Sequence, residues 1–188
     1  VIINPMAAYA LSRFKLKQSV SLLLFCLATM AFPAEVTMIP NFLLIKQLGL
    51  LNTFWALILP GAASGFSIFL LKGFFDSLPP ELYEAGMLDG ASEMTLFYKV
   101  TLPLSGPIFA VIALNAFTGM YSSYLFAMTI EQSQKQWPLM VWIYELGAQA
   151  APNYAMMAAL MCAAIPTLIV FLFAQNVIMK GIILPSYK

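Results

Sequence analysis

The sequence predicts an all-α membrane protein, a polytopic bundle of helices in a single domain over residues 1–188. Of its 188 residues, 62% are hydrophobic and only 9% are charged, whereas about a quarter of a soluble domain is usually charged. The apolar residues form long stretches bounded by polar clusters, as spanning helices require. At roughly 20 residues per span, the length allows several spans and no sizeable soluble domain.

Four apolar stretches are long enough to cross a bilayer. In chain order these spans A to D cover about 19–40, 54–75, 107–130 and 155–179. Pro33 and Pro40 predict bends or a break in span A. Pro60 predicts a kink in span B, and Pro166 is expected to interrupt span D. Residues 1–11 resemble the last turns of an earlier span, and a chain that opens on Val instead of Met is expected to be the tail of a longer protein.

The residue types exclude several kinds of chemistry. Histidine is absent, and the two cysteines, Cys26 and Cys162, lie far apart in apolar stretches. A zinc, haem or histidine-based acid–base site is therefore not expected. No catalytic residue and no metal ligand is predicted. The net charge of +1 offers no basic field for nucleic acid.

The lysines and arginines predict the orientation, because short cytoplasmic loops carry an excess of them. In a four-span arrangement seven of the nine fall on one side: Arg13, Lys15, Lys17, Lys72, Lys99, Lys180 and Lys188. Only Lys46 and Lys135 fall on the other side. We predict that the side with seven is cytoplasmic, so the loop after span B and the C-terminus face the cytoplasm. The Trp-rich segment after span C then faces outward and lies flat on the surface.

The loop after span B holds five of the eight acidic side chains and is predicted to lie outside the bilayer. Pro79 and Pro80 suit the first turn of a short helix. Three apolar residues at three-residue spacing give that helix an apolar flank: Leu82, Ala85 and Leu88. Asp89 and Gly90 predict a sharp turn, because Gly accepts the left-handed conformation, and Ser92 can cap a second helix. The loop is therefore predicted to form a helix, a turn and a second helix.

Within this loop, EAGMLDGASEMTLFYKVTLP resembles the "EAA" loop of ABC importer permeases. The matching positions are Glu84, Ala85, Asp89, Gly90, Ala91, Phe97, Leu102 and Pro103. Gly86 stands where that family usually has Ala, which lowers helix propensity by up to about 1 kcal/mol. Four other stretches resemble the carbohydrate branch, the maltose-type second permease: AAYALSRFKLK, FPAEVTMIP, LGLLNT and FFDSLPPELYEA. The resemblance covers most of the chain.

The resemblance implies the type I ABC importer permease fold, N-terminally truncated to the last four spans and a remnant of an earlier one. It implies that the coupling (EAA) loop 79–103 docks on an ATP-binding subunit. The residues given this role are Leu82, Glu84, Ala85, Leu88, Asp89, Gly90 and Ala91. The sequence has no GxxxxGK[ST] phosphate loop, so we expect ATP and Mg²⁺ on two partner ATP-binding subunits, and this transport subunit is not expected to be an enzyme.

The same resemblance implies a second permease subunit, an extracytoplasmic solute-binding protein and a multi-pass place in the bacterial inner membrane. Polar residues of span C are candidates for a sugar path, since hydroxyl and aromatic groups suit sugars: Asn115, Thr118, Tyr121 and Ser122. Hydrogen bonding between helices is the alternative role for these residues, worth about 0.6 kcal/mol on average. Glu35 could serve a proton-coupled carrier, but its place near the outer end of span A favours a structural role.

The predicted function is import of a sugar or an oligosaccharide. Another solute class, such as a polyol, a glycerol phosphate or a uronate oligomer, remains open. An ion-driven secondary carrier is a further alternative, and it predicts charged relays buried in mid-span. Spans B, C and D contain none.

Overall fold

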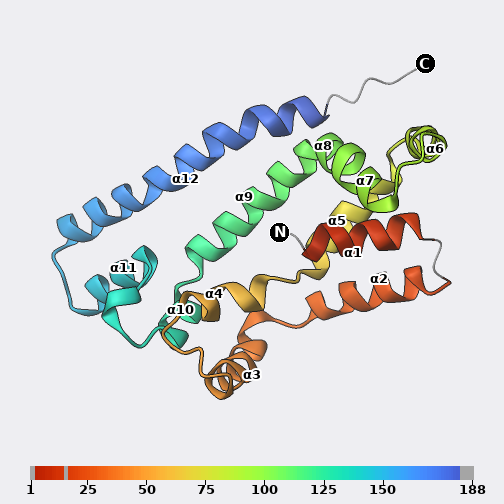
Figure 1. Ribbon diagram of the computed structural model, residues 1–188. Coiled ribbons are helices and arrows are strands. Elements are labelled where there is room, and N and C mark those ends of the chain that lie inside the picture. Colours follow the sequence, from red (N-terminus) through yellow and green to blue (C-terminus); the bar gives the residue numbers. More distant parts are fainter. Residues whose placement is uncertain (1–2, 15–16, 183–188) are drawn as a thin grey trace. The chain divides into compact units, whose positions relative to one another are not determined.

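The structure is a computed structural model that describes residues 3–14 and 17–182, with side chains as far as residue 179. Lys15 and Lys188, used above for the orientation, lie outside the described residues, as does the side chain of Lys180. Every regular element in the described part is a helix (Figure 1). The α-helices are α1 (Ile3–Arg13), α2 (Ser19–Ala28), α3 (Ala34–Gln47), α4 (Phe54–Ile58), α5 (Gly65–Asp76), α6 (Pro80–Leu88), α7 (Glu93–Leu96), α8 (Leu102–Leu104), α9 (Gly106–Ser122), α10 (Tyr124–Ile130), α11 (Leu139–Ala148) and α12 (Asn153–Ile182). Short 3₁₀ turns cover Thr29–Ala31, Leu59–Gly61 and Gln134–Gln136, and a π-helical turn covers Phe97–Thr101.

One helical stretch of the described chain, Asn153–Met179 in α12, is long and apolar enough to cross a membrane by itself. The number rises to four if each of three helix pairs that meet at a short break is one span. These pairs are Ser19–Ala31 with Ala34–Gln47, Phe54–Gly61 with Gly65–Asp76, and Glu93–Leu104 with Gly106–Ser122. The predicted number of passes stays a prediction.

The helix breaks follow the prolines only in part. Span A breaks at Pro33 as predicted, but Pro40 lies inside α3. The kink expected near Pro60 is present as a 3₁₀ turn. The expected interruption at Pro166 is wrong, because α12 runs through it. A proline removes a single backbone donor, and helices of membrane proteins tolerate that loss.

Span C is also shorter than predicted. Helix α9 ends at Ser122, and α10 begins as a separate helix at Tyr124. Ser123 between them has φ −82° and ψ 66°, which is not helical. The apolar composition of this stretch, which carries no charge, gave no sign of the break.

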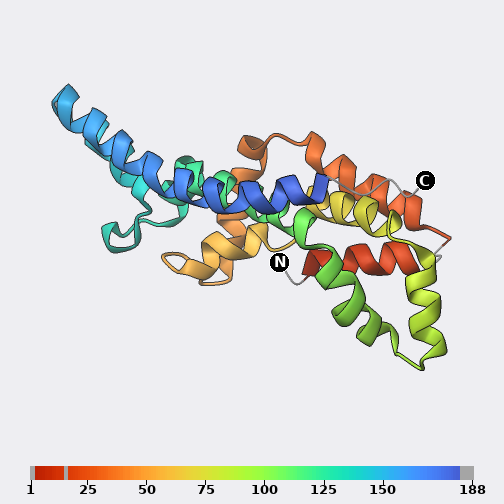
Figure 2. The same cartoon turned by 90° about the horizontal axis from the view of Figure 1, so that it is seen from above.

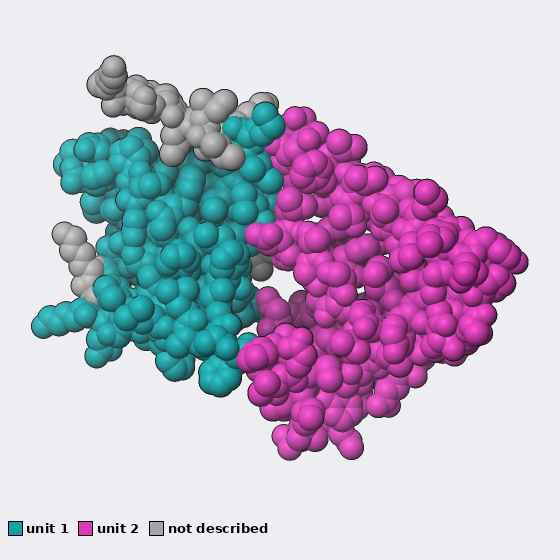
Figure 3. Space-filling view, turned by 180° about the vertical axis from the view of Figure 1, so that it is seen from behind, with its two compact units in different colours: residues 1–32, 62–112, 177–188 teal, residues 33–61, 113–176 magenta. Residues whose placement is uncertain are grey.

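The described chain divides into two compact units, coloured in Figure 3. Unit 1 comprises residues 1–32, 62–112 and 177–188, and unit 2 comprises residues 33–61 and 113–176.

Unit 1 has a core of aromatic and aliphatic side chains: Ala8, Tyr9, Leu71, Phe75, Tyr83, Leu96 and Phe97. Helix α1 lies along α5 (Figures 1 and 2), and α2 also packs on α5. A Cβ at Gly65 would overlap the carbonyl oxygen of Cys26, so a glycine lets α2 and α5 approach closely. The buried Asn4 side chain accepts a hydrogen bond from the Ser64 backbone N–H at 3.1 Å. These contacts make α1, predicted to be a remnant, an integral part of the unit.

Unit 2 contains two loops joined by hydrogen bonds, residues 48–53 and 131–138, which we name the loop junction. Asn52 has φ 58°, a left-handed conformation that Asn tolerates better than most residues. Its side-chain oxygen accepts the backbone N–H groups of Gln132 at 2.7 Å and Ser133 at 3.0 Å. The indole N–H of Trp137 donates to the Glu131 carbonyl oxygen at 2.8 Å. Hydrogen bonds within the junction therefore hold its two loops together.

Candidate functional site

The segment predicted to dock on an ATP-binding subunit, residues 79–103, forms two short helices joined by a tight turn, as predicted; we name it the coupling segment (Figure 1). Helix α6 begins directly after Pro79. At its end Gly90 has φ 77°, and the Ala91 N–H donates to the Gly86 carbonyl oxygen at 2.9 Å. This bond closes the helix through a left-handed glycine. The predicted turn is therefore confirmed.

The second helical arm begins with the predicted cap. The Ser92 hydroxyl oxygen accepts the Thr95 backbone N–H at 3.3 Å. After α7 the chain passes through a π-helical turn, a feature often found at functional sites. The arm Glu93–Leu104 then meets α9 at an angle of 75°. The second helix therefore turns sharply before it continues into α9, which the sequence did not predict.

Most of the predicted docking residues are exposed on α6 and on the turn that follows it. Leu88 is 90% exposed and Leu82 is 42% exposed. Glu84, Ala85, Asp89 and Gly90 are exposed as well. Ala91 differs, because it is half-buried and packs against the core of unit 1. The structure therefore brings six of the seven predicted residues onto one exposed end of the unit, and their role in docking stays a prediction.

The buried face of α6 was missed by the sequence reasoning. Tyr83 is fully buried, and its hydroxyl lies 2.9 Å from the Thr101 hydroxyl. One turn later, a Cβ at Gly86 would overlap the buried Leu96 side chain. Tyr83 and Gly86 share a helix face because they are three residues apart, and this spacing was a signal that could have found them. The Gly that departs from the family pattern thus allows close packing.

The predicted sugar-path residues are mostly engaged within the protein. The Thr118 hydroxyl donates to the Leu114 carbonyl oxygen at 2.5 Å, and the Ser122 hydroxyl donates to the Thr118 carbonyl oxygen at 2.5 Å. Tyr121 donates to the Ala163 carbonyl oxygen at 2.9 Å, which joins α9 to α12. Asn115 is exposed on α9. Only the Tyr121 bond is the contact between helices that the alternative predicts, whereas Thr118 and Ser122 form hydrogen bonds within α9.

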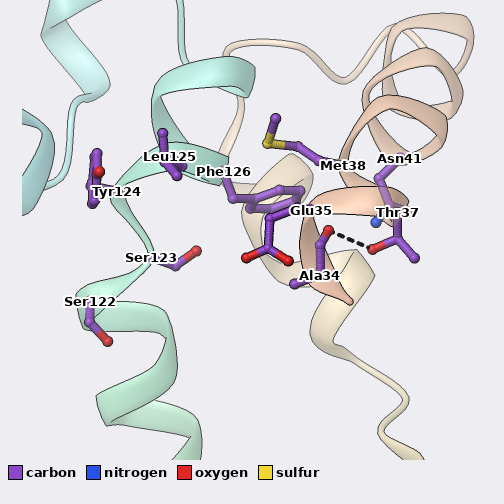
Figure 4. A pocket seen from close by; sticks show the side chains of 10 residues that line it. All are labelled: Ala34, Glu35, Thr37, Met38, Asn41, Ser122, Ser123, Tyr124, Leu125 and Phe126. Carbon is purple, nitrogen blue, oxygen red and sulfur yellow. Dashed lines mark hydrogen bonds between the residues drawn. The ribbon is translucent and has the colours of Figure 1, made fainter. Parts of the chain in front are cut away.

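A pocket of about 280 Å³ lies in unit 2 between the first turns of α3 and the break between α9 and α10 (Figure 4). Its polar side chains come from Glu35, Thr37, Asn41, Ser122, Ser123 and Tyr124. In Figure 4 the Glu35 carboxylate lies between the start of α3 and Ser123. A second pocket, of about 270 Å³, is lined by Tyr121 and again by Ser123. The break at Ser123 therefore lies beside both pockets, and the first pocket has the more polar lining.

Known proteins resemble the chain over its whole length. Residues 3–183 match the family described as binding-protein-dependent transport system inner membrane component. The chain is 34% identical to the polygalacturonan/rhamnogalacturonan transport system permease protein YtcP of Bacillus subtilis (strain 168), over 100% of this chain and 71% of that protein. It is also 34% identical to the galactooligosaccharides transport system permease protein GanQ of the same organism, over 93% of this chain and 63% of that protein.

Among solved structures, a bacterial ABC transporter involved in the import of the acidic polysaccharide alginate contains a similar chain. The TM-score is 0.71 at 26% identity, and the match covers 98% of this chain and 67% of the other. The predicted type I ABC importer permease fold is therefore confirmed. The chain belongs to the family of binding-protein-dependent transport system inner membrane components, the permease subunits of ABC importers.

Proposed function

We propose that this chain is a membrane-spanning permease subunit of an ATP-driven importer that translocates a sugar or an oligosaccharide. The observation that carries the proposal is the exposed apolar end of α6, where Leu88 is 90% exposed on a helix otherwise fixed by the buried Tyr83. A large apolar side chain held out on a rigid helix suits an apolar cleft of a partner. The relatives named for oligosaccharides support the substrate class.

The coupling segment would then receive the motion of the ATP-binding subunits. ATP and Mg²⁺ would be bound by those subunits, so this chain would hydrolyse no ATP of its own. Closure of the nucleotide-bound pair would pull on α6 and shift the bundle between inward-open and outward-open states. A second permease, an extracytoplasmic solute-binding protein and a multi-pass place in the inner membrane complete the proposal.

The sugar path would follow the two pockets of unit 2. Glu35, Asn41 and Ser123 offer hydrogen-bond acceptors and donors in the pocket of about 280 Å³, and sugars bind through such groups together with aromatic faces. Of the residues predicted from the sequence, Ser122 and Tyr121 line the two pockets. Asn115 and Thr118 line neither pocket and remain weaker candidates.

The experiment is uptake by the complete transporter reconstituted in proteoliposomes with its solute-binding protein. Four radiolabelled probes are offered in turn: trigalacturonate, galactotriose, diacetylchitobiose and glycerol phosphate. We expect uptake of galactotriose or diacetylchitobiose, whereas uptake of trigalacturonate alone would favour the uronate-oligomer alternative. The uptake should depend on ATP on the side of the membrane that carries the ATP-binding subunits, and ionophores that collapse ion gradients should not affect it.

Two controls separate the alternatives. Vesicles lacking the ATP-binding subunits should take up none of the probes. Uptake of glycerol phosphate alone would contradict the substrate class, whereas uptake that needs an ion gradient and no ATP would contradict the proposed function itself.

A further inference from the structure

Helix α1 contacts the second arm of the coupling segment through a buried tyrosine. The Tyr9 hydroxyl donates to a Glu93 carboxylate oxygen at 2.7 Å, and the Tyr9 ring centroid lies 5.0 Å from that of Phe97. Tyr9 is only 5% exposed. Hydrogen bonds to a charged acceptor are roughly twice as strong as neutral ones. Tyr9 therefore ties α1 to the first turn of α7.

One turn further along α1, Arg13 contacts the other helix of the segment. Its guanidinium carbon lies 3.7 Å from the ring centroid of Tyr83 in α6, which is the geometry of a cation–π contact. The Arg13 Nε is buried and has no hydrogen-bond partner among the described residues. The ring of Tyr83 is therefore the contact that joins Arg13 to α6.

Tyr9 and Arg13 lie on the same face of α1, because residues four apart on a helix are neighbours. We name this pair the α1 clamp. On another side α1 is joined to α5, where the Ser12 hydroxyl donates to Asp76 at 2.6 Å. The clamp thus holds both helices of the coupling segment on a helix that is itself anchored in unit 1.

We propose that the α1 clamp makes α1 move together with the coupling segment. Without it, the segment joins the unit through its two chain ends and the packing of its core residues. With it, displacement of α6 is passed directly to α1 and from there to α5. Tyr9 and Arg13 are positioning residues in this inference, which rests on the proposed function.

The test is the ratio of solute imported to ATP hydrolysed by the reconstituted transporter, measured with whichever of the four probes the unaltered protein imports. Tyr9→Phe keeps the buried ring and removes only the hydroxyl. We expect the ratio to fall at least about threefold, in keeping with the loss of one hydrogen bond to a charged group, while ATP hydrolysis continues. Glu93→Ala should lower the ratio by a similar factor. Glu93→Gln keeps an acceptor for the Tyr9 hydroxyl, so its ratio should stay close to that of the unaltered protein.

Tyr154→Phe is the matched control, because Tyr154 is 79% exposed and lies at the start of α12, outside the coupling segment and the α1 clamp; its ratio should not change. A Tyr9→Phe transporter with an unchanged ratio would overturn the clamp. So would a parallel loss of assembled complex, uptake and hydrolysis at constant ratio, which is the mark of a merely structural role. Unaltered vesicles whose uptake needs an ion gradient and no ATP would contradict the proposed function instead.

Discussion

The coupling segment and the loop junction both connect apolar helices, yet they differ in the side chains that they expose and bury. The coupling segment leaves Leu88 90% exposed. The loop junction buries the carboxylate of Glu131, which is 1% exposed, and satisfies its backbone through Asn52. The first keeps an apolar surface available for the proposed partner, and the second joins its two loops by hydrogen bonds of its own. Substitutions in the two regions should therefore disturb different properties.

The largest effect is expected at the exposed end of α6. Leu88→Asp would place an unpaired charge in the proposed apolar cleft, at a cost of several kcal/mol. ATP-driven uptake per permease in the membrane should fall at least about tenfold, since about 1.4 kcal/mol already changes an equilibrium tenfold. Leu48→Asp is the control, because Leu48 is 59% exposed and lies within the loop junction. Equal uptake by the two variants would remove the distinction between the regions.

The next effect concerns stability in unit 2. Asn52→Ala removes the acceptor of two backbone N–H groups and places Ala at φ 58°, and we expect a loss of about 2–3 kcal/mol in unfolding free energy. Denaturation followed by tryptophan fluorescence measures it, because Trp55, Trp137 and Trp142 all lie in unit 2. Asn52→Asp keeps the acceptor oxygen, so its unfolding free energy should fall much less. Similar losses of unfolding free energy in both variants would refute the role of the side-chain oxygen.

A smaller effect depends on pH. Both Glu131 carboxylate oxygens lack a hydrogen-bond partner among the described residues, and burial raises the pKa of this carboxyl above its ordinary value of 4.5. The folded protein then holds the proton more tightly than the unfolded chain. The unfolding free energy should therefore fall as pH rises from about 4.5 to the raised pKa, and change no further above it.

Glu131→Gln should remove this slope, because the amide does not titrate. At pH 7 it should also raise the unfolding free energy by about 1 kcal/mol, since a buried amide costs less than a buried unpaired charge. The same tryptophan fluorescence, recorded between about pH 4 and pH 8, measures both changes. If the pH dependence of the unfolding free energy persists in the variant, a group other than Glu131 causes it.

The smallest effect is expected at Gly86. Ala would gain up to about 1 kcal/mol of helix propensity, but its Cβ would displace the buried Leu96 side chain. The two effects should therefore leave the unfolding free energy of Gly86→Ala within about 1 kcal/mol of that of the unaltered protein. In a Leu96→Ala background the conflict disappears, so the same change should stabilise α6, as measured by hydrogen exchange of its amides. Stabilisation of equal size in both backgrounds would show that the packing does not matter.

Several features of the site could be predicted because they depend on neighbouring residues alone. Pro79 starts α6, Gly90 ends it and Ser92 caps α7, since caps and turns need only local conformations and hydrogen bonds. The buried face was not predictable in the same way. Tyr83 finds its partners in Thr101 and in Arg13 of α1, 18 and 70 positions away; such pairs depend on how the helices pack.

The sequence by itself determined that the chain is apolar and helical, where its long apolar stretches lie, and that its coupling segment is two helices around a glycine turn. These properties follow from composition, periodicity and local backbone chemistry. Only the tertiary structure decided that α9 breaks at Ser123 while α12 passes through Pro166, and that Gly86 packs against Leu96. Helix breaks and close approaches depend on contacts with residues distant in the chain, which no local pattern records.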